Sequence, residues 1–357
     1  RCHREYEAGR LCPYDGEEML PAPRIELFRC RPTRHRGDVL GRRYQVRGYL
    51  GKGAMAKVYL AEDLETRRPV AIKVLDAAHA RTLRTRERFL REARAAAMID
   101  HPNVVRVLDV GERSDATPFL VMEYLFGESL GDWLRRERTM DRDLALPTLR
   151  HAASGLAAAH RAGIVHRDVK PDNLFLVGEP GDPYGLKVLD FGLAKISEQV
   201  GLTVTGYAVG TVEYMAPEQV VGDAPDGRTD VYALGVVMYR VFTGDLPFPR
   251  GDEDADLLAQ HLLVPPPPPT DRRPGVDPRA EAVILRALRK RPENRYPSMD
   301  AFIEDLDRLV GDRPGRLRAE APLPSPDDAY APRGTFARSA TAYFCRRLGM
   351  VPPLLDG

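Results

Sequence analysis

The densest group of side chains able to do chemistry lies in residues 166–173, HRDVKPDN. An apolar run follows at once, at residues 174–177, and a second apolar run ends in Asp190. If the two runs pair as a hairpin, Asp168, Asn173 and Asp190 come to the same end of it. Two carboxylates and a carboxamide oxygen are hard ligands, which suit a Mg²⁺ ion that carries phosphate groups. The spacing therefore predicts a metal–phosphate site.

A glycine-rich run, GKGAMAKV at residues 51–58, could hold the phosphates themselves. Glycine has no Cβ, so the backbone N–H groups of such a loop can approach phosphate oxygens closely. A strand-like run, Val58–Ala61, comes next, whereas a dinucleotide-binding fold would need a helix there. We therefore expect the loop to be the turn of a hairpin, with Ala56 where a third glycine would complete the motif.

Lys73 lies in the middle of an apolar strand predicted at residues 70–75, where an ammonium group is costly to bury without a partner. Glu92 supplies that partner, because it lies on the apolar side of a helix predicted at residues 86–98. We expect an ion pair between the two side chains. Such a pair could be purely structural, but the preceding glycine loop favours a role in phosphate binding.

The composition limits the class of protein. The chain has 357 residues, of which 43% are hydrophobic, and its 53 basic and 52 acidic residues nearly cancel. A net charge of +1 argues against a nucleic-acid partner or an anionic membrane surface. No apolar run reaches the roughly 18 residues of a membrane helix. Four cysteines are too few for a disulfide scaffold, which favours a reducing, cytoplasmic location. The first residue is Arg, which indicates a fragment.

The order of the predicted elements indicates an α+β fold. Strand-like runs dominate the first third of the chain, and helical patterns follow at residues 149–161, 231–242, 280–288 and 299–309. We therefore expect a small β-rich part with one main helix, then a large, mainly helical part. Five consecutive prolines, Pro265–Pro269, predict a stiff extended connector, which either joins two helices or serves as an SH3-type ligand.

Taken together, these motifs resemble those of the eukaryotic-type protein kinases, and most closely those of the bacterial serine/threonine kinases. In chain order they are the Gly51 loop, VAIK at 70–73, Glu92, HRDVKPDN at 166–173, DFG at 190–192, APE at 216–218, Asp230 and Arg295. The resemblance runs from about residue 43 to residue 309. It implies the two-lobed protein-kinase fold.

The same resemblance implies a domain organisation. The kinase domain would span residues 43–310, with an N-lobe at 43–125 and a C-lobe at 126–310. An N-terminal extension, residues 1–42, would precede it. Residues 311–357 would follow, and their composition, rich in Pro and Arg, predicts a flexible tail.

The resemblance gives the 166–173 run its expected roles in phosphoryl transfer. Asp168 would orient the substrate hydroxyl and accept its proton, and Lys170 would offset charge on the γ-phosphate. Asn173 and Asp190 would bind Mg²⁺, which Mn²⁺ can replace. Thr211 would contact Asp168 and Lys170 and shape the acceptor site. The lysine at 170 and the Gly-Thr pair before APE are typical of the Ser/Thr-specific branch.

ATP is the expected nucleotide. Lys73, paired with Glu92, would hold its α- and β-phosphates, and backbone groups after Met122 would bind the adenine. The residues expected to bind ATP are Leu50, Gly51, Lys52, Gly53, Ala54, Met55, Ala56, Lys57, Val58, Ala71, Lys73, Met122, Glu123, Leu125 and Phe175. Away from the nucleotide, Glu218 would pair with Arg295, and Asp230 would brace the catalytic loop.

Control by phosphorylation is also implied. Thr203 and Thr205 fall where bacterial relatives are autophosphorylated, and a phosphate there would pair with Arg167. Self-association for trans-autophosphorylation is a possible partner interaction, beside ATP and protein substrates. The alternative is that the segment is merely polar and flexible.

The expected function is therefore an ATP-dependent protein serine/threonine kinase of the EC 2.7.11.1 type. The alternatives are a pseudokinase or nucleotide-binding signalling scaffold, and a small-molecule phosphotransferase with the same fold. All the charged catalytic residues are present, which argues against the first, and the complete activation segment argues against the second.

Cys2 and Cys12 resemble part of a zinc ribbon that precedes some bacterial kinases. Asp15 is an unusual zinc ligand, and Cys30 is poorly spaced, so a tetrahedral site cannot be completed from these residues. We expect reduced, free thiols and no Zn²⁺ within this fragment.

Overall fold

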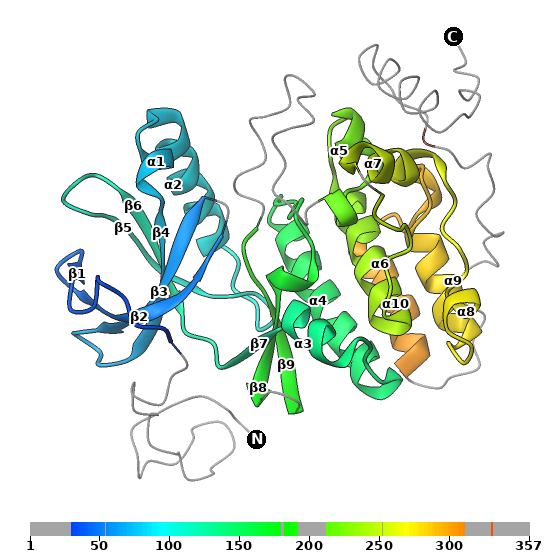
Figure 1. The fold of residues 1–357 in the computed structure, drawn as a ribbon, viewed down its shortest axis with the longest axis horizontal. Coiled ribbons are helices and arrows are strands. Elements are labelled where there is room, and N and C mark those ends of the chain that lie inside the picture. Colours follow the sequence, from blue (N-terminus) through cyan, green and yellow to red (C-terminus); the bar gives the residue numbers. More distant parts are fainter. Residues whose placement is uncertain are drawn as a thin grey trace. The chain divides into compact units, whose positions relative to one another are not determined.

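The computed structural model describes residues 30–53, 55–179, 182–191, 212–251, 253–310 and Tyr330, apart from the side chains of residues 84, 88, 92, 179 and 182–184. The chain divides into two compact units, which we describe one at a time (Figure 1). The first contains the residues up to Arg94 together with Arg106–Phe126. The second contains Ala95–Val105 and the residues from Gly127 onward.

The first unit is built on a six-stranded antiparallel sheet with the strand order β1-β2-β3-β4-β6-β5. Its strands are β1 (Val39–Leu40), β2 (Tyr44–Lys52), β3 (Ala56–Asp63), β4 (Pro69–Leu75), β5 (Val107–Glu112) and β6 (Pro118–Glu123). Two helices, α1 (Ala77–Ala80) and α2 (Leu83–Ala97), follow β4. The strands and the main helix that the sequence predicts are all present, and α2 begins a few residues earlier than expected.

One face of this sheet carries an apolar core. The buried side chains that form it alternate along the strands, as expected for residues on one face of a sheet. They are Leu40, Tyr44, Val46, Tyr59, Ala61, Val70, Ile72, Val74, Phe119 and Val121. The residues between them point to the opposite face, and these include Val58, Ala71 and Lys73.

Residues before the predicted domain start also belong to the sheet. Val39 and Leu40 pair with Gln45 and Tyr44. Further upstream, Arg31 and Tyr49 exchange two backbone hydrogen bonds of 2.8 Å. The sheet therefore begins before residue 43, and the sequence did not indicate this because paired segments of one or two residues carry no periodicity.

The second unit is mainly helical, with a small sheet in the order β7-β8-β9. Its strands are β7 (Gly127–Ser129), β8 (Leu174–Glu179) and β9 (Asp182–Val188). Its α-helices are α3 (Leu130–Glu137), α4 (Arg142–Arg161), α5 (Pro217–Val221), α6 (Gly227–Thr243), α7 (Asp254–Leu263), α8 (Pro269–Arg272), α9 (Pro278–Ala287) and α10 (Met299–Val310). Short 3₁₀ turns lie at η2 (Pro171–Asn173), η3 (Val212–Tyr214) and η4 (Pro292–Asn294).

Helix α6 is the centre of this unit. It is buried along almost its whole length, as its continuous apolar sequence predicts, and it contacts α4, α9 and α10. A Cβ at Gly235 would lie 2.8 Å from the Cβ of Ala287, so glycine is needed for the close approach of α6 and α9. Because α6 is fixed on all sides, side chains on its first turn are rigid supports for the loops beside them.

The two ends of helix α4 can be compared with the predicted helix at residues 149–161. Helix α4 begins at Arg142 rather than Leu149, because Pro147 lies inside it and masks the pattern of its first turns. Its end agrees with the prediction, since Gly163 has φ +74°, which glycine adopts readily.

No helix in the described part of the chain is long and apolar enough to span a membrane.

Candidate active site

The glycine loop is the turn between β2 and β3, as predicted. Gly51 lies opposite Val58, and Lys52 lies opposite Lys57. The Gly53 N–H donates to the Ala56 carbonyl over 2.8 Å. Ala54 lies outside the described residues.

Lys73 lies on the neighbouring strand, beside this loop. It is directly opposite Val58 on β3, and Ala71 is directly opposite Met122 on β6. Directly opposed residues of antiparallel strands share a face. Val58, Ala71, Lys73 and Met122 therefore lie together on the face opposite the apolar core. This common face is what a nucleotide-binding surface on the sheet requires.

The side chain of Glu92 lies outside the described residues, although its backbone belongs to α2. The ion pair expected between Glu92 and Lys73 therefore stays a prediction. At the end of β6, the Glu123 N–H donates to the Arg106 carbonyl over 3.0 Å.

In the second unit, Asp168 is held by two residues of its own loop. Its Oδ2 accepts from Lys170 Nζ over 2.8 Å and from Asn173 Nδ2 over 3.2 Å. The Asn173 amide also donates to the Asp168 carbonyl over 2.8 Å. Since the nitrogen of the Asn173 side chain is used in this way, its oxygen is the atom that can ligate a metal.

Asp190 is brought to Asn173 by the hairpin of β8 and β9. The N–H of Leu189 donates to the Asn173 carbonyl over 2.8 Å, and Asp190 is the next residue along the chain. Phe175, the expected adenine contact, lies on β8 between the buried residues Leu174 and Leu176 and points to the other face of the strand.

His166 links the loop to the residues around Asp190. Its Nδ1 accepts from the Asp168 N–H over 3.2 Å, and its Nε2 lies 2.8 Å from the Leu189 carbonyl. A carbonyl can only accept, so these two bonds assign the ring proton to Nε2. The same ring packs against Phe191, with centroids 5.0 Å apart. His166 therefore positions both Asp168 and the segment that carries Asp190.

Asp230, on the first turn of α6, is fully buried beneath the loop of residues 166–173. It accepts from the N–H groups of His166 and Arg167, both over 2.8 Å, and lies 2.7 Å from His160 Nε2. Arg167 has φ +64°, a left-handed conformation that is costly for a residue with a side chain. The two amide bonds to Asp230 hold the loop in this conformation.

We expect Asp230→Asn to lower the rate of phosphate transfer more than tenfold. Asparagine has one oxygen, so one of the two buried N–H groups would lose its acceptor at a cost of about 1–3 kcal/mol. Transfer from labelled ATP and the melting temperature would both be measured. Asp226→Asn is the matched control on the same helix. Asp226 caps the helix and pairs with Arg228 near the surface, asparagine caps equally well, and a surface ion pair contributes little. Unchanged transfer in Asp230→Asn would contradict the bracing role.

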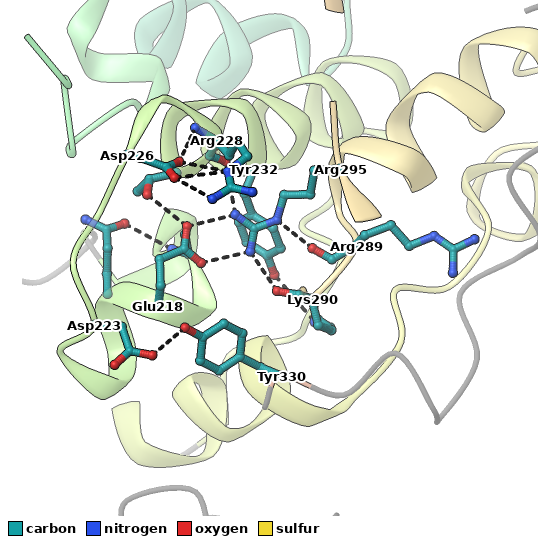
Figure 2. Close-up of polar contacts among 12 residues, drawn as sticks. Glu218, Asp223, Asp226, Arg228, Tyr232, Arg289, Lys290, Arg295 and Tyr330 are labelled. Atoms are coloured by element: carbon teal, nitrogen blue, oxygen red, sulfur yellow. Dashed lines mark hydrogen bonds and ion pairs between the residues drawn. The ribbon is translucent and has the colours of Figure 1, made fainter. Parts of the chain in front are cut away.

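Glu218 and Arg295 form a bidentate ion pair in the interior, with both N···O distances 2.8 Å (Figure 2). Glu218 also accepts from Thr229 Oγ1 over 2.8 Å. The remaining donors of Arg295 bind the carbonyls of Arg228, Arg289 and Lys290 at 2.7–3.0 Å. All five guanidinium N–H groups are thus used. This network joins α5, α6 and the segment before η4.

Two residues of the site were missed by the sequence analysis. Gln219 accepts from the Ala216 N–H over 3.1 Å and donates to the Arg167 carbonyl over 2.9 Å, so it connects α5 to the loop of residues 166–173. His160, at the end of α4, contacts Asp230. Neither belongs to a recognisable motif in the sequence, and only their neighbours in the fold reveal them.

Several expected residues cannot be placed. Thr203, Thr205 and Thr211 lie outside the described residues, as do Gly192 and the cysteines Cys2, Cys12 and Cys345. Cys30, which is described, carries a free thiol.

The donor set at Asn173 and Asp190 suits Mg²⁺. Within the described ranges no three His, Cys, Asp or Glu side chains are grouped to hold a metal ion. Mg²⁺ does not require such a group, because it keeps several waters and is bound by one or two carboxylates together with substrate phosphates.

The protein-kinase fold consists of an antiparallel sheet unit followed by a helical unit. Here the sheet unit carries the glycine hairpin and, on the face opposite its apolar core, Lys73. The helical unit carries the loop of residues 166–173. The family model described as protein kinase domain matches residues 44–305, so the chain belongs to the protein kinase family. This confirms the family and the fold class that the sequence motifs indicated.

Relatives with known names agree with this assignment. The chain is 40% identical over 283 residues to "Serine/threonine-protein kinase pkn3" of Myxococcus xanthus, an alignment that covers 78% of this chain and 52% of the relative. It is 41% identical over 280 residues to "Serine/threonine-protein kinase PknB" of Mycobacterium tuberculosis, covering 77% and 44%. The chain thus spans about half the length of these curated relatives.

A solved structure is also similar. The kinase domain of Mycobacterium tuberculosis PknI matches with a TM-score of 0.60 and 30% identity, covering 77% of this chain and 98% of that chain.

Proposed function

We propose that this chain transfers the γ-phosphate of ATP to serine and threonine hydroxyls of proteins. The observation that carries the proposal is the geometry of the catalytic loop. Asp168 is held between Lys170 and Asn173, and Asp190 comes directly after the residue that bonds to Asn173. The protein kinase family to which the chain belongs uses ATP and a divalent metal, and we propose Mg²⁺ as that metal.

In this proposal each residue has one task. The Asp168 carboxylate orients the substrate hydroxyl and accepts its proton as the oxygen attacks phosphorus. Lys170 places a positive charge beside the transferring phosphoryl group. Asn173 and Asp190 hold the metal, which neutralises charge on the phosphates when bound. Lys73 holds the other phosphates. The protein positions the reactants and stabilises charge without forming a covalent intermediate.

Serine and threonine, rather than tyrosine, are proposed as acceptors because of Lys170 and because of the relatives' names. The test is to incubate the chain with labelled ATP, Mg²⁺ and a generic basic protein, then to hydrolyse the product and separate the phosphoamino acids. Phosphoserine and phosphothreonine are expected. Phosphotyrosine, or label in small molecules only, would overturn the assignment. ATP binding without any transfer would instead indicate the scaffold function of a pseudokinase.

We further propose that phosphate on Thr203 or Thr205 activates the chain through Arg167. Support comes from Arg167 Nε, which is buried and has no hydrogen-bond partner among the described residues. A charge-assisted bond to phosphate contributes about 1.5–3 kcal/mol, which is roughly a tenfold effect or more.

The corresponding prediction is that the Thr203→Ala/Thr205→Ala chain is at least about tenfold less active than phosphorylated wild type. Both proteins would be prepared with and without phosphatase treatment, and initial transfer rates would be compared. Ser197→Ala, in the same segment, is the control and should behave as wild type. Equal rates for the double variant and phosphorylated wild type would exclude activation through Arg167. We also propose that the chain self-associates for trans-autophosphorylation and that it is located in the cytoplasm.

A further inference from the structure

The carbonyl groups at the C-terminal end of helix α7 lack N–H donors in the proline run that comes after the helix. The last four carbonyls of an α-helix have no N–H partner within the helix itself, and they need donors from elsewhere. Val264 N–H bonds to the Gln260 carbonyl over 3.1 Å. The next residues are Pro265–Pro268, and proline has no N–H to donate. The proline run therefore obliges α7 to take its capping donors from distant parts of the chain.

Two distant donors are found there. Lys290 Nζ donates to the Gln260 carbonyl over 3.1 Å. The backbone N–H of Tyr330 donates to the Leu262 carbonyl over 3.1 Å. Tyr330 thus acts as a capping residue for α7, although it lies in the C-terminal tail, residues 311–357.

The side chain of Tyr330 is held by the same surface. Only 4% of the residue is exposed. It packs in one apolar cluster with residues of η3, α5, α7 and the segments beside them, namely Val212, Met215, Val220, Val221, Phe248, Ala255, Leu257, Leu258, Ala259, Leu262 and Leu263. Its hydroxyl donates to Asp223 Oδ2 over 2.6 Å (Figure 2). Burial, and then the bond to Asp223, raise the pKa of Tyr330 above its usual range, so the phenol keeps the proton that it donates.

Asp223 connects this contact to the interior network. Gly222, which ends α5, has φ +79° and so turns the chain sharply. The Asp223 N–H then donates to the Glu218 carbonyl over 2.8 Å. Glu218 is the partner of Arg295. Tyr330 is therefore linked through Asp223 to Glu218, a member of the buried ion pair of this unit.

We propose that η3, α5, α7 and Asp223 form a docking site for a tyrosine residue, and that Tyr330 of the same chain occupies it. The site recognises the residue at three points: a backbone N–H, an aromatic ring and a phenol hydroxyl. Because Val212 and Met215 share the apolar cluster, Tyr330 also supports two residues that follow the activation segment. This inference concerns the tail and does not depend on the proposed activity.

Hydrogen–deuterium exchange on the full chain tests the docking. We expect Tyr330→Ala to exchange about tenfold faster than wild type, both in the peptide that contains residue 330 and in the peptide that contains the end of α7. A tenfold change equals about 1.4 kcal/mol. Tyr330→Phe, which keeps the ring and the N–H bond but loses the hydroxyl, should show a smaller increase. Tyr343→Ala is the matched control in the same tail and should leave both peptides unchanged.

Two outcomes would overturn the proposal. The first is equal exchange of these peptides in wild type and Tyr330→Ala. The second is protection that disappears on dilution, since the tyrosine would then come from another copy. If Tyr330→Ala does not fold, Tyr330→Phe and Asp223→Asn give the same comparison with smaller changes.

Discussion

Asp168→Asn is expected to lower the rate of phosphate transfer by about 10²–10⁴-fold, the range that a positioned general base contributes. The substitution keeps the size and shape of the side chain. It still offers an oxygen to Lys170 and Asn173, which donate to Asp168 over 2.8 and 3.2 Å. The capacity to accept the proton of the substrate hydroxyl is lost. The measurement is the initial rate of transfer from labelled ATP, with nucleotide binding and the melting temperature as separate readouts.

The same loop offers a matched control. Asp172 is exposed and pairs with Arg135 over 3.2 Å at the surface. Asp172→Asn makes the same chemical change in the same loop and should alter the rate by no more than about twofold, because a surface ion pair contributes about 0–1 kcal/mol. Comparable rates for the two variants, or a parallel loss of folding in Asp168→Asn, would show that Asp168 has no special chemical role.

Arg295→Met is expected to give the largest loss of stability in the helical unit. The side chain of Arg295 is fully buried, and that of Glu218 is 4% exposed. Removing one member of such a pair leaves a buried charge without compensation, at a cost of about 3–5 kcal/mol. At about 2–4 °C per kcal/mol, the melting temperature should fall by about 6–20 °C. Urea unfolding would give the free energy directly.

Two comparisons sharpen this prediction. Arg161→Met removes a surface pair with Asp300, whose side chains are 60% and 62% exposed, and should cost no more than about 1 kcal/mol. The double variant Glu218→Gln/Arg295→Met should cost less than the sum of the two single changes, because neither charge is left alone. Additive single changes, or an Arg295→Met chain as stable as Arg161→Met, would contradict a structural role for the buried pair.

The sequence predicted the parts of the protein in which chemistry requires particular residue types. Lys73 and the 166–173 run are conspicuous because polar groups interrupt apolar runs, and the glycine hairpin is marked by the strand-like run Val58–Ala61 directly after it. Helix α6 was predicted from continuous apolar sequence. Each of these signals is local, so it can be read without knowing the fold.

Other features depend on contacts between distant segments and leave no local signal. The pairing of Arg31 with Tyr49 involves single residues, and Gln219 reaches Arg167 across the fold. Tyr330 lies in a tail whose composition suggested flexibility, yet the need for its N–H arises at Pro265–Pro268. The proline run predicted a connector. Its further consequence, a helix end that must be capped from elsewhere, requires the fold to be known.

The proposed function rests on one claim, that Lys73 and the oxygen ligands of the second unit act on a single metal-bound nucleotide. The most direct test is a crystal structure of the chain with Mg²⁺ and a non-hydrolysable ATP analogue. We predict Lys73 Nζ at the α- and β-phosphates, Asn173 and Asp190 on Mg²⁺, and Asp168 facing the γ-phosphate. A structure in which the nucleotide contacts only one of these groups, with the others facing elsewhere, would contradict the claim.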